Sequence, residues 1–572
     1  MAFRIAAVTL AAALISTPVL SEKVIEKVDP VIVGQSESSP SGGMTADMLY
    51  EFLLAEIASQ RNQGEVAAEA YAELARETRD PRIAQRAVEV ALANRDGGMG
   101  LAVKATNLWL ELEPNSIPAQ QTLIALLLTT GKISEAVNPV QRLLAAQPDN
   151  AGRVFLQLAG LMTRYPDKPA VLILMKDLAS SYQTLPEARF ATAQAAKLAE
   201  QPELALSESK AALQLRPDWE LAAQLHGEVL SKSAPQRAIK FYREFLAKHP
   251  QSREIRTNLA RDLANEKDFA GARKEFQFLI TAAPNTAEYH LALGILSMEM
   301  KDYSAAEKHL TRTLQLNFRD PDVVRTYLGQ LNEDQKRYTE AIGWYRQVEE
   351  GDGYFASHVR VAFLMAKQGD LKGGRAYLSS VRTASPEQKS LLVIADAQLL
   401  RDAKQYEAAL DVLSQGLKSQ PDSLELLYDR AMTAEKLDRM DMLEADLRKV
   451  MVLKPDYAQA YNALGYTFAE RNIRLTEGLE LIEKANLLEP EDAAILDSMG
   501  WIQYRIGNLD KSLDFLRRAL AMRPDPEIAA HLAEVLLARG QRGEAKTVSE
   551  KALHDNPDNE ALLAVVKKLE LH

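Results

Sequence analysis

Proline returns along this chain at nearly constant intervals of 33 to 35 residues, or close to a multiple of that spacing. The prolines that keep the period are Pro81, Pro114, Pro148, Pro217, Pro250, Pro284, Pro386, Pro421, Pro455, Pro490, Pro524 and Pro557. Where a proline is missing, Tyr182, Phe318 and Gly353 occupy the periodic place. Self-similarity at a fixed period of this length indicates one supersecondary unit copied many times. The sequence therefore predicts a repeat array.

The unit is easiest to follow over residues 493–524. Its apolar residues form two stripes at helical spacing, namely Leu496, Met499 and Ile502, then Leu509, Leu513, Leu516 and Leu520. The first stripe predicts a helix over 493–505 and the second a helix that ends before Pro524. Gly507 and Asn508 lie between them and tolerate the left-handed backbone of a tight turn. The unit is thus predicted to be helix, short turn, helix, proline.

Small residues recur where the two helices of a unit must approach each other: Gly500 with Ala519, Gly465 with Ala485, and Gly294 with Thr313. Together with Tyr461-Asn462-Ala463-Leu464-Gly465-Tyr466 and Ala519-Leu520-Ala521-Met522-Arg523-Pro524, this pattern resembles the tetratricopeptide repeat, which has a period of about 34 residues. The resemblance covers residues 47–557. It implies an all-α solenoid, a right-handed superhelix of about fifteen helix pairs. A stripe of Leu562, Leu563, Val566 and Leu569 predicts a C-terminal capping helix within residues 558–572.

Charge argues against a nucleic-acid partner. Pentatricopeptide repeats have a similar length and read RNA one base per repeat. This chain carries 68 Lys and Arg against 79 Asp and Glu, a net charge of -11, whereas a nucleic-acid binder needs a basic face that neutralises phosphates. We therefore expect protein or extended peptide partners and no nucleic acid.

The amino-terminal residues differ from the repeats. Arg4 followed by the apolar run 5–15 is typical of a signal peptide over residues 1–21, cleaved near Ser21, although a retained anchor is the alternative. Residues 22–46 are rich in Pro, Gly and polar residues and read as a flexible linker, in which Val31-Ile32-Val33 could also dock as a strand; Asp47 is the expected N-cap of the first helix. The chain has no Cys, so we expect a periplasmic protein that is not a lipoprotein, with no transmembrane span in the mature chain.

No enzyme motif is present, and we expect no catalytic, metal or cofactor site. The eight His residues are scattered and none has His-x-x-x-His metal-ligand spacing. Ser207 and Lys210 have Ser-x-x-Lys spacing but lack the accompanying elements of acyl-enzyme formers. The glycine-rich stretch 96–100 lacks the Gly-Lys-Ser/Thr of a phosphate-binding loop and is expected to be an inter-helix turn.

Function in such an array normally lies on the face made by the first helix of each unit. Near the carboxyl end this face is predicted to carry Tyr428, Asn462, Tyr466, Asp497, Trp501, Tyr504 and Arg505. Aromatic and Arg side chains make good anchors for extended peptides, because they bury a large area at low entropy cost. The alternative is that Tyr466 and Trp501 pack between successive helices, since an error of one residue in register rotates a side chain by about 100°.

The carboxyl third, from Tyr461 to Gly478 and again from Asp497 to Trp501, resembles the large exported repeat proteins of proteobacteria, among them the lipoprotein partner of the carboxyl-terminal processing protease. That resemblance implies an adaptor for a periplasmic protease and its substrates, but the absence of Cys departs from the lipid-anchored family member. A scaffold for envelope polysaccharide export or type IV pilus biogenesis is the second hypothesis. A glycosyltransferase would need a catalytic α/β domain, for which the repeats leave no room.

Overall fold

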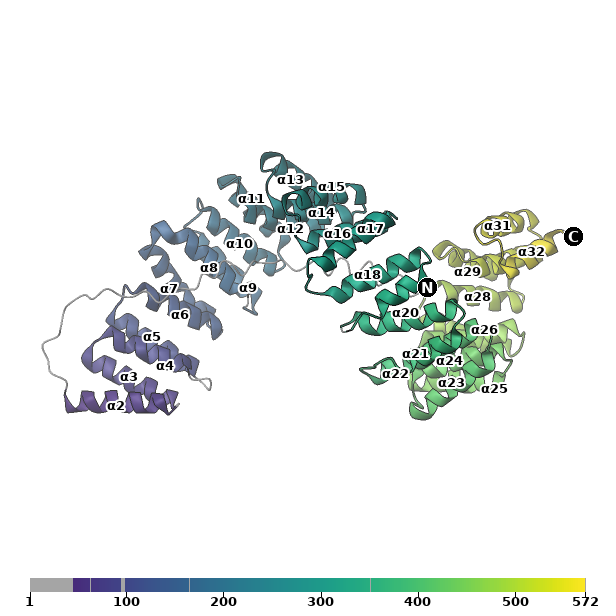
Figure 1. Ribbon diagram of the computed structural model, residues 1–572, viewed down its shortest axis with the longest axis horizontal. Coiled ribbons are helices and arrows are strands. Elements are labelled where there is room, and N and C mark those ends of the chain that lie inside the picture. The colour runs from purple at the N-terminus through teal and green to yellow at the C-terminus, as the bar shows by residue number, and fades with distance from the viewer. Residues whose placement is uncertain (1–44, 62, 94–97, 164, 350, 571–572) are drawn as a thin grey trace. The chain divides into compact units, whose positions relative to one another are not determined.

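The computed structural model describes residues 45–61, 63–93, 98–163, 165–349 and 351–570 (Figure 1). Within these ranges it holds 31 α-helices and no strand, which form fifteen sequential pairs from α2/α3 to α30/α31, followed by the single helix α32. The prediction of an all-α array of about fifteen helix pairs with a closing helix is confirmed. The signal peptide and nearly all of the linker lie outside the described residues. Among the helices that are described, none combines the length and apolar character needed to cross a bilayer.

The chain divides into two compact units after Phe318. In unit 1 the helices are α2 (Ala46–Gln60), α3 (Gly64–Thr78), α4 (Pro81–Ala93), α5 (Gly98–Leu112), α6 (Ile117–Thr129), α7 (Ile133–Ala146), the 3-10 turn η2 (Pro148–Asn150), α8 (Ala151–Met162), α9 (Lys168–Ala179), α10 (Pro186–Leu198), α11 (Pro202–Leu215), α12 (Glu220–Ser233), α13 (Pro235–Lys248), α14 (Arg253–Asn265), α15 (Phe269–Ala282), α16 (Ala287–Glu299) and α17 (Tyr303–Gln315). Most helices of the unit pack against their neighbours in sequence, as the repeat predicts, whereas α7 contacts α9 and α8 contacts α10.

In unit 2 the helices are α18 (Pro321–Asp334), α19 (Tyr338–Tyr345), α20 (Gly353–Lys367), α21 (Leu371–Leu378), α22 (Pro386–Asp402), α23 (Tyr406–Ser419), α24 (Leu424–Lys436), α25 (Met440–Leu453), α26 (Ala458–Glu470), α27 (Leu475–Leu488), α28 (Ala493–Arg505), α29 (Leu509–Met522), α30 (Pro526–Ala538), α31 (Arg542–Asp555) and α32 (Glu560–Glu570). First helices also contact the next first helix, as α26 does α28 and α28 does α30. Successive first helices therefore build one continuous face within the unit.

The turn inside most pairs contains one residue in the left-handed region. Gly507 has φ +89°, as its place in the sequence predicts. In seven other pairs the same place is taken by a residue with a side chain, namely Glu200, Lys267, Lys301, Lys336, Lys404, Asp438 and Asn472, all with φ between 54° and 64°. The packing of the two helices thus imposes the turn conformation, and the residue type does not.

The small residues of the repeat mark close helix contacts, but not always with the partner that the sequence suggests. A Cβ on Gly500 would lie 2.5 Å from Leu516 Cγ, and one on Gly465 would lie 2.7 Å from the carbonyl oxygen of Gly478. Close approach at these glycines is confirmed. Ala519, expected against the first helix of its own repeat, packs in a cluster with Ala493 and Leu496 of α28 and with Ile528 of α30. It therefore lies where its own first helix and the next repeat both approach.

A polar clamp recurs inside the repeats. A side chain in the first helix bonds a partner 19 residues later in the second helix, in the pairs Arg189 with Glu208, Arg256 with Glu275, His290 with His309, and His358 with Tyr377. The side chains of Arg189, Arg256 and His290 also donate to the carbonyl oxygen six residues earlier, at the end of the preceding repeat. In these three repeats the clamp ties the first helix to both neighbours and satisfies a carbonyl group in the connection.

Both ends of the array differ in detail from the prediction. The N-cap of α2 is Thr45, whose Oγ1 accepts from the Met48 amide at 3.2 Å, and Asp47 lies in the first helical turn. On α32, Leu562 and Val565 are buried, whereas Leu563 is 45% exposed. Leu563 was therefore wrongly assigned to the capping stripe, since Val565 lies on the same face as Leu562 at a spacing of three residues.

Candidate functional site

The structure brings five of the predicted residues together on the first helices of unit 2. Asp497, Trp501 and Arg505 follow each other at intervals of four residues along α28, so they share one face of that helix. Tyr504 is beside Trp501, and Tyr466 comes from α26. His531 of α30, which the sequence did not single out, lies against them. We call Tyr466, Asp497, Trp501, Tyr504, Arg505 and His531 the C-terminal aromatic cluster.

His531 is at the centre of this cluster. Its Nδ1 lies 2.9 Å from Oδ1 of Asp497, one repeat earlier. Its ring stacks on Trp501 with centroids 4.2 Å apart and an interplanar angle of 22°. The ring of Tyr466 lies 6.2 Å away, centroid to centroid. Three successive first helices thus meet at one imidazole.

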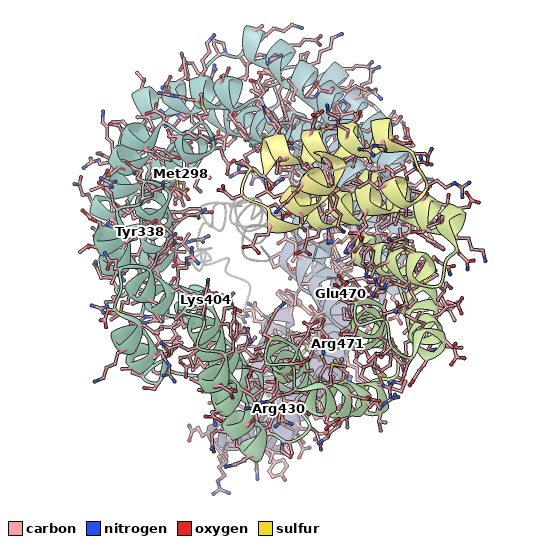
Figure 2. The ribbon with its side chains drawn as sticks, turned by 90° about the vertical axis from the view of Figure 1, so that its right-hand side faces the viewer. Met298, Tyr338, Lys404, Arg430, Glu470 and Arg471 are labelled. Carbon is pink, nitrogen blue, oxygen red and sulfur yellow. The ribbon has the colours of Figure 1, made fainter. Side chains whose placement is uncertain are left out.

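Arg505 is committed to the backbone of the neighbouring helix. Its Nε donates to the carbonyl oxygen of Ala469 at 3.0 Å, and a second guanidinium nitrogen donates to that of Glu470 at 3.2 Å. These acceptors lie at the carboxyl end of α26, where the last carbonyl groups lack a helical partner. Figure 2 labels Glu470 and Arg471 at this helix end. Arg505 therefore holds α28 against α26 through backbone carbonyl groups.

Carboxylates dominate the charged surroundings of the cluster. Burial, the largest single influence, lowers the pKa of His531, but the hydrogen bond to Asp497 and the charges of Asp497, Glu470 and Glu527 outweigh it and raise that pKa above its ordinary value. Burial, and after it the charges of Glu470, Asp497 and Glu527, raises the pKa of Tyr466. The same three carboxylates thus raise the pKa of two different groups of the cluster.

Two buried polar atoms on this face have no hydrogen-bond partner within the described residues. They are Nε1 of Trp501, which is 5% exposed, and Oδ1 of Asn462 on α26. One is a donor and the other an acceptor. Each such atom costs about 1–3 kcal/mol when left unpaired, so their presence on one helical face needs an explanation.

Tyr428 has a different aromatic neighbour from the residues of the cluster. It lies on α24 and makes an edge contact with Tyr457, 5.9 Å between centroids. Burial, then the neighbouring Tyr457, Glu435 and Asp429, raises its pKa to about 12. Trp501 and Asp497 are buried, while Tyr466, Tyr504 and Arg505 are half-buried. Trp501 thus packs between helices at the base of the cluster, and its neighbours form its accessible part.

The other residues considered for chemistry lie apart from one another. Across the described part of the chain, no three His, Asp or Glu side chains are placed to hold a metal ion. Ser207 and Lys210 are exposed on α11. Gly98 and Gly100 belong to the first turn of α5, so the glycine-rich stretch is partly helical; Asp96 and Gly97 lie outside the described residues.

His531, Glu470 and Glu527 were missed by sequence reasoning. The available signal was spacing, because His531 follows Asp497 by 34 residues, one repeat period, and equivalent positions of successive first helices are neighbours. Glu527 sits four residues before His531 on the same helix. A search for oppositely charged or hydrogen-bonding residues 34 positions apart would have paired His531 with Asp497 and so located the cluster.

Comparison with known proteins agrees with this architecture. A tetratricopeptide repeat family model matches residues 257–322 and 291–354. The chain is 31% identical over 510 residues to the TPR repeat-containing protein PA4667 of Pseudomonas aeruginosa, covering 88% of this chain and 85% of that protein. It is 28% identical over 149 residues to the mitochondrial import receptor subunit TOM70 of Rattus norvegicus, covering 25% and 24%.

Solved structures give the same kind of match. A thermophilic TPR protein of Thermus thermophilus is 26% identical and covers 32% of this chain and all of its own, with a TM-score of 0.30. The Cut9-Hcn1 structure covers 92% of this chain and 96% of its own at 14% identity and a TM-score of 0.33. On the strength of its fifteen helix pairs and its full-length relative, the chain belongs to the tetratricopeptide repeat family.

Proposed function

We propose that this chain is a non-enzymatic adaptor that holds an extended segment of a partner protein on the first helices of unit 2, at the C-terminal aromatic cluster. The observation that carries the proposal is the half-buried aromatic surface of Tyr466 and Tyr504 beside Trp501, on successive first helices. The same face holds two atoms that are unpartnered among the described residues, Trp501 Nε1 and Asn462 Oδ1, which are closed to solvent. An extended peptide offers carbonyl oxygens to the first atom and amide N–H groups to the second, so a small shift of the covering side chains on binding would satisfy both.

The aromatic rings supply the apolar part of such a site. Tyr466 and Tyr504 are half-buried beside Trp501, so they present ring area to a ligand without a further loss of side-chain freedom. Rigid aromatic anchors of this kind carry much of the binding energy in protein interfaces. The supporting residues are already held in place by Arg505 and by the pair His531 and Asp497. The site is preorganised, which lowers the entropy cost of binding.

The partner that we propose is a periplasmic processing protease of the carboxyl-terminal type, or its substrates. The support is the resemblance of the carboxyl third to exported repeat proteins that serve such proteases. The amino-terminal run 5–15 after Arg4 supports export to the cell envelope. The matching relatives and the family model name repeat proteins and no catalytic activity, which supports an adaptor role.

Photo-crosslinking in the native host tests this proposal. A benzophenone amino acid replaces Tyr504 in the full chain, and the matched control replaces Leu487, which is exposed on the second helix α27. We expect crosslinks to an envelope protease or its substrate from position 504 and not from 487. Equal crosslinking at both positions, or none at 504, would contradict the proposal. Capture of pilus or polysaccharide-export components at 504 would favour the second hypothesis.

Two conservative substitutions test the unpartnered atoms. Trp501→Phe removes the N–H and keeps an aromatic ring, and Asn462→Leu removes the carbonyl oxygen at similar volume. Deleting an unsatisfied polar group stabilises the fold, and the smaller ring of Trp501→Phe leaves a cavity that opposes this gain. We therefore expect thermal stability to change little while the crosslink yield at position 504 falls about tenfold. A lower melting temperature with unchanged crosslinking would show that these atoms serve packing alone.

A further inference from the structure

The charges around the cluster are unevenly paired. Asp497 is hydrogen-bonded to His531, and Arg471 is paired with Asp438. Glu470 and Glu527 are exposed, and within the described ranges neither lies at ion-pair distance from a Lys or Arg side chain. Glu470 follows Tyr466 by about one helical turn on α26, Glu527 precedes His531 by about one turn on α30, and the ring centroids of Tyr466 and His531 lie 6.2 Å apart. Two carboxylates therefore flank one pair of neighbouring rings, and both raise the pKa of Tyr466 and of His531.

Arg505 is not available to pair with the carboxylates of Glu470 and Glu527. The guanidinium of Arg505 is 5.7 Å from the centre of the Trp501 ring, but its donors are used by the carbonyl oxygens of Ala469 and Glu470. Releasing Arg505 would take a donor from both helix-end carbonyls, of which that of Ala469 would keep the Asn472 amide. The carboxylates of Glu470 and Glu527 are thus left for a group from outside the chain.

We propose that the segment bound at the C-terminal aromatic cluster is basic, with a Lys or Arg side chain that lies between the carboxylates of Glu470 and Glu527 and against the ring of Tyr466. This inference rests on the proposed function and names the chemistry of its ligand. A cation is attracted both by a carboxylate and by the face of an aromatic ring. Trp501 Nε1 is buried in the same cluster with no hydrogen-bond partner among the described residues, and it would donate to the backbone of the same segment once the side chains that cover it shift on binding.

The chain as a whole favours such a ligand. Its net charge of -11 attracts a basic segment from a distance, and the attraction weakens as salt screens it. Binding of a basic segment should therefore fall steeply between low salt and about 0.5 M salt, whereas an apolar contact would not.

Three labelled peptides of about twelve residues provide the test, with Lys, Gln or Glu at the same alternate positions in a Ser and Val background. Fluorescence anisotropy measures their binding to the full chain at low salt. We expect the Lys peptide to bind at least about tenfold more tightly than the other two. Equal affinity for the Lys and Gln peptides would overturn the proposal.

A matched pair of variants assigns the effect to the cluster. Glu470→Gln with Glu527→Gln should lower the affinity for the Lys peptide about tenfold. Glu480→Gln with Glu483→Gln removes the same number of charges from exposed positions of the second helix α27, and should change it less than about twofold. An equal loss in both variants would show attraction by net charge alone and would reject the site.

The two proposals fail differently. If position 504 crosslinks a partner but the Gln and Glu peptides compete for it as well as the Lys peptide does, the adaptor function stands and the basic ligand is wrong. If position 504 crosslinks nothing and no peptide binds, both are wrong.

Discussion

Two buried histidine sites, one in each unit, titrate in opposite directions. In unit 1 the Nδ1 atoms of His290 and His309 lie 3.0 Å apart, and burial followed by the charges of His290, Lys308 and Arg273 lowers the pKa of His309 to about 4. In unit 2 the carboxylates around His531 overcome burial and raise its pKa. Burial sets the size of such a shift, and the neighbours decide its sign.

The two sites also differ in what they connect. His290 and His309 belong to the clamp inside one repeat, so their role is to hold one pair of helices. His531 and Asp497 come from first helices one period apart, on the face that we propose binds a ligand. A histidine that is satisfied within its repeat is structural, whereas one that bridges repeats beside free carboxylates marks a candidate site.

Removing the ring of Trp501, on which His531 stacks, should produce the largest effect. Trp501→Ala opens a cavity in the packing of α26, α28 and α30, and we expect the free energy of unfolding to fall by about 3–5 kcal/mol. Chemical denaturation followed by circular dichroism measures it. Tyr50→Ala, at a residue 64% exposed on α2, is the control and should change little. A small loss for Trp501→Ala would mean that the ring is not part of the core.

Asp497→Asn should make the histidine of unit 2 resemble that of unit 1. Without the carboxylate, burial dominates, so the pKa of His531 should fall below its ordinary value, and stability should fall by about 2 kcal/mol at neutral pH. NMR titration of the imidazole Cε1 proton follows the pKa directly. A pKa that stays raised would assign the effect to Glu470 and Glu527 instead.

The pH dependence of stability should carry opposite signatures from the two sites. His531 has a raised folded-state pKa, so its contribution is complete below the unfolded pKa near 6.5 and is lost as pH rises through the folded value. His309 has a lowered pKa, so stability falls as pH drops from about 6.5 toward 4. We expect His531→Gln to remove the loss on the alkaline side and His309→Gln that on the acid side, each by roughly 2 kcal/mol or less.

Melting temperatures of the wild type and both variants between about pH 4 and 9 measure these signatures as differences. The groups that face His531 are Asp497, Glu470, Glu527 and Tyr466, so the variant comparison separates its titration from theirs. Parallel curves for all three proteins would break the contrast between the sites.

The smallest expected effect is a single surface charge beside the unit 1 pair. Lys308 lies on α17, and its charge contributes to the lowered pKa of His309. Lys308→Gln should raise that pKa by a few tenths of a unit, because solvent screens a charge near the surface. The NMR titration detects this, and Lys274→Gln on α15 serves as a control.

The period of the prolines was enough to predict the helix pairs, because helix, turn and stop signals repeat with it. The cluster was predicted in part. Tyr466, Asp497 and Trp501 follow from register on the first helix, but whether Trp501 faces a ligand or the next helix depends on how closely α26, α28 and α30 pack. His531 required knowledge of contacts between repeats. Thr45 and Val565 show that ends of the array shift by one or a few residues, since no neighbour fixes their register.

The turns in which Lys, Glu, Asp or Asn adopts a left-handed backbone could be made more stable by substitution. Each costs roughly 1 kcal/mol relative to glycine, and since repeats interact mainly with their neighbours, replacing one by glycine should stabilise its own pair. A graded set of such replacements would therefore tune hydrogen exchange pair by pair along the solenoid. Asn472 lies in the turn that follows α26, the helix that carries Tyr466 of the C-terminal aromatic cluster. A glycine there would change the stability of that helix pair, and with it the proposed binding affinity, without altering a residue of the cluster.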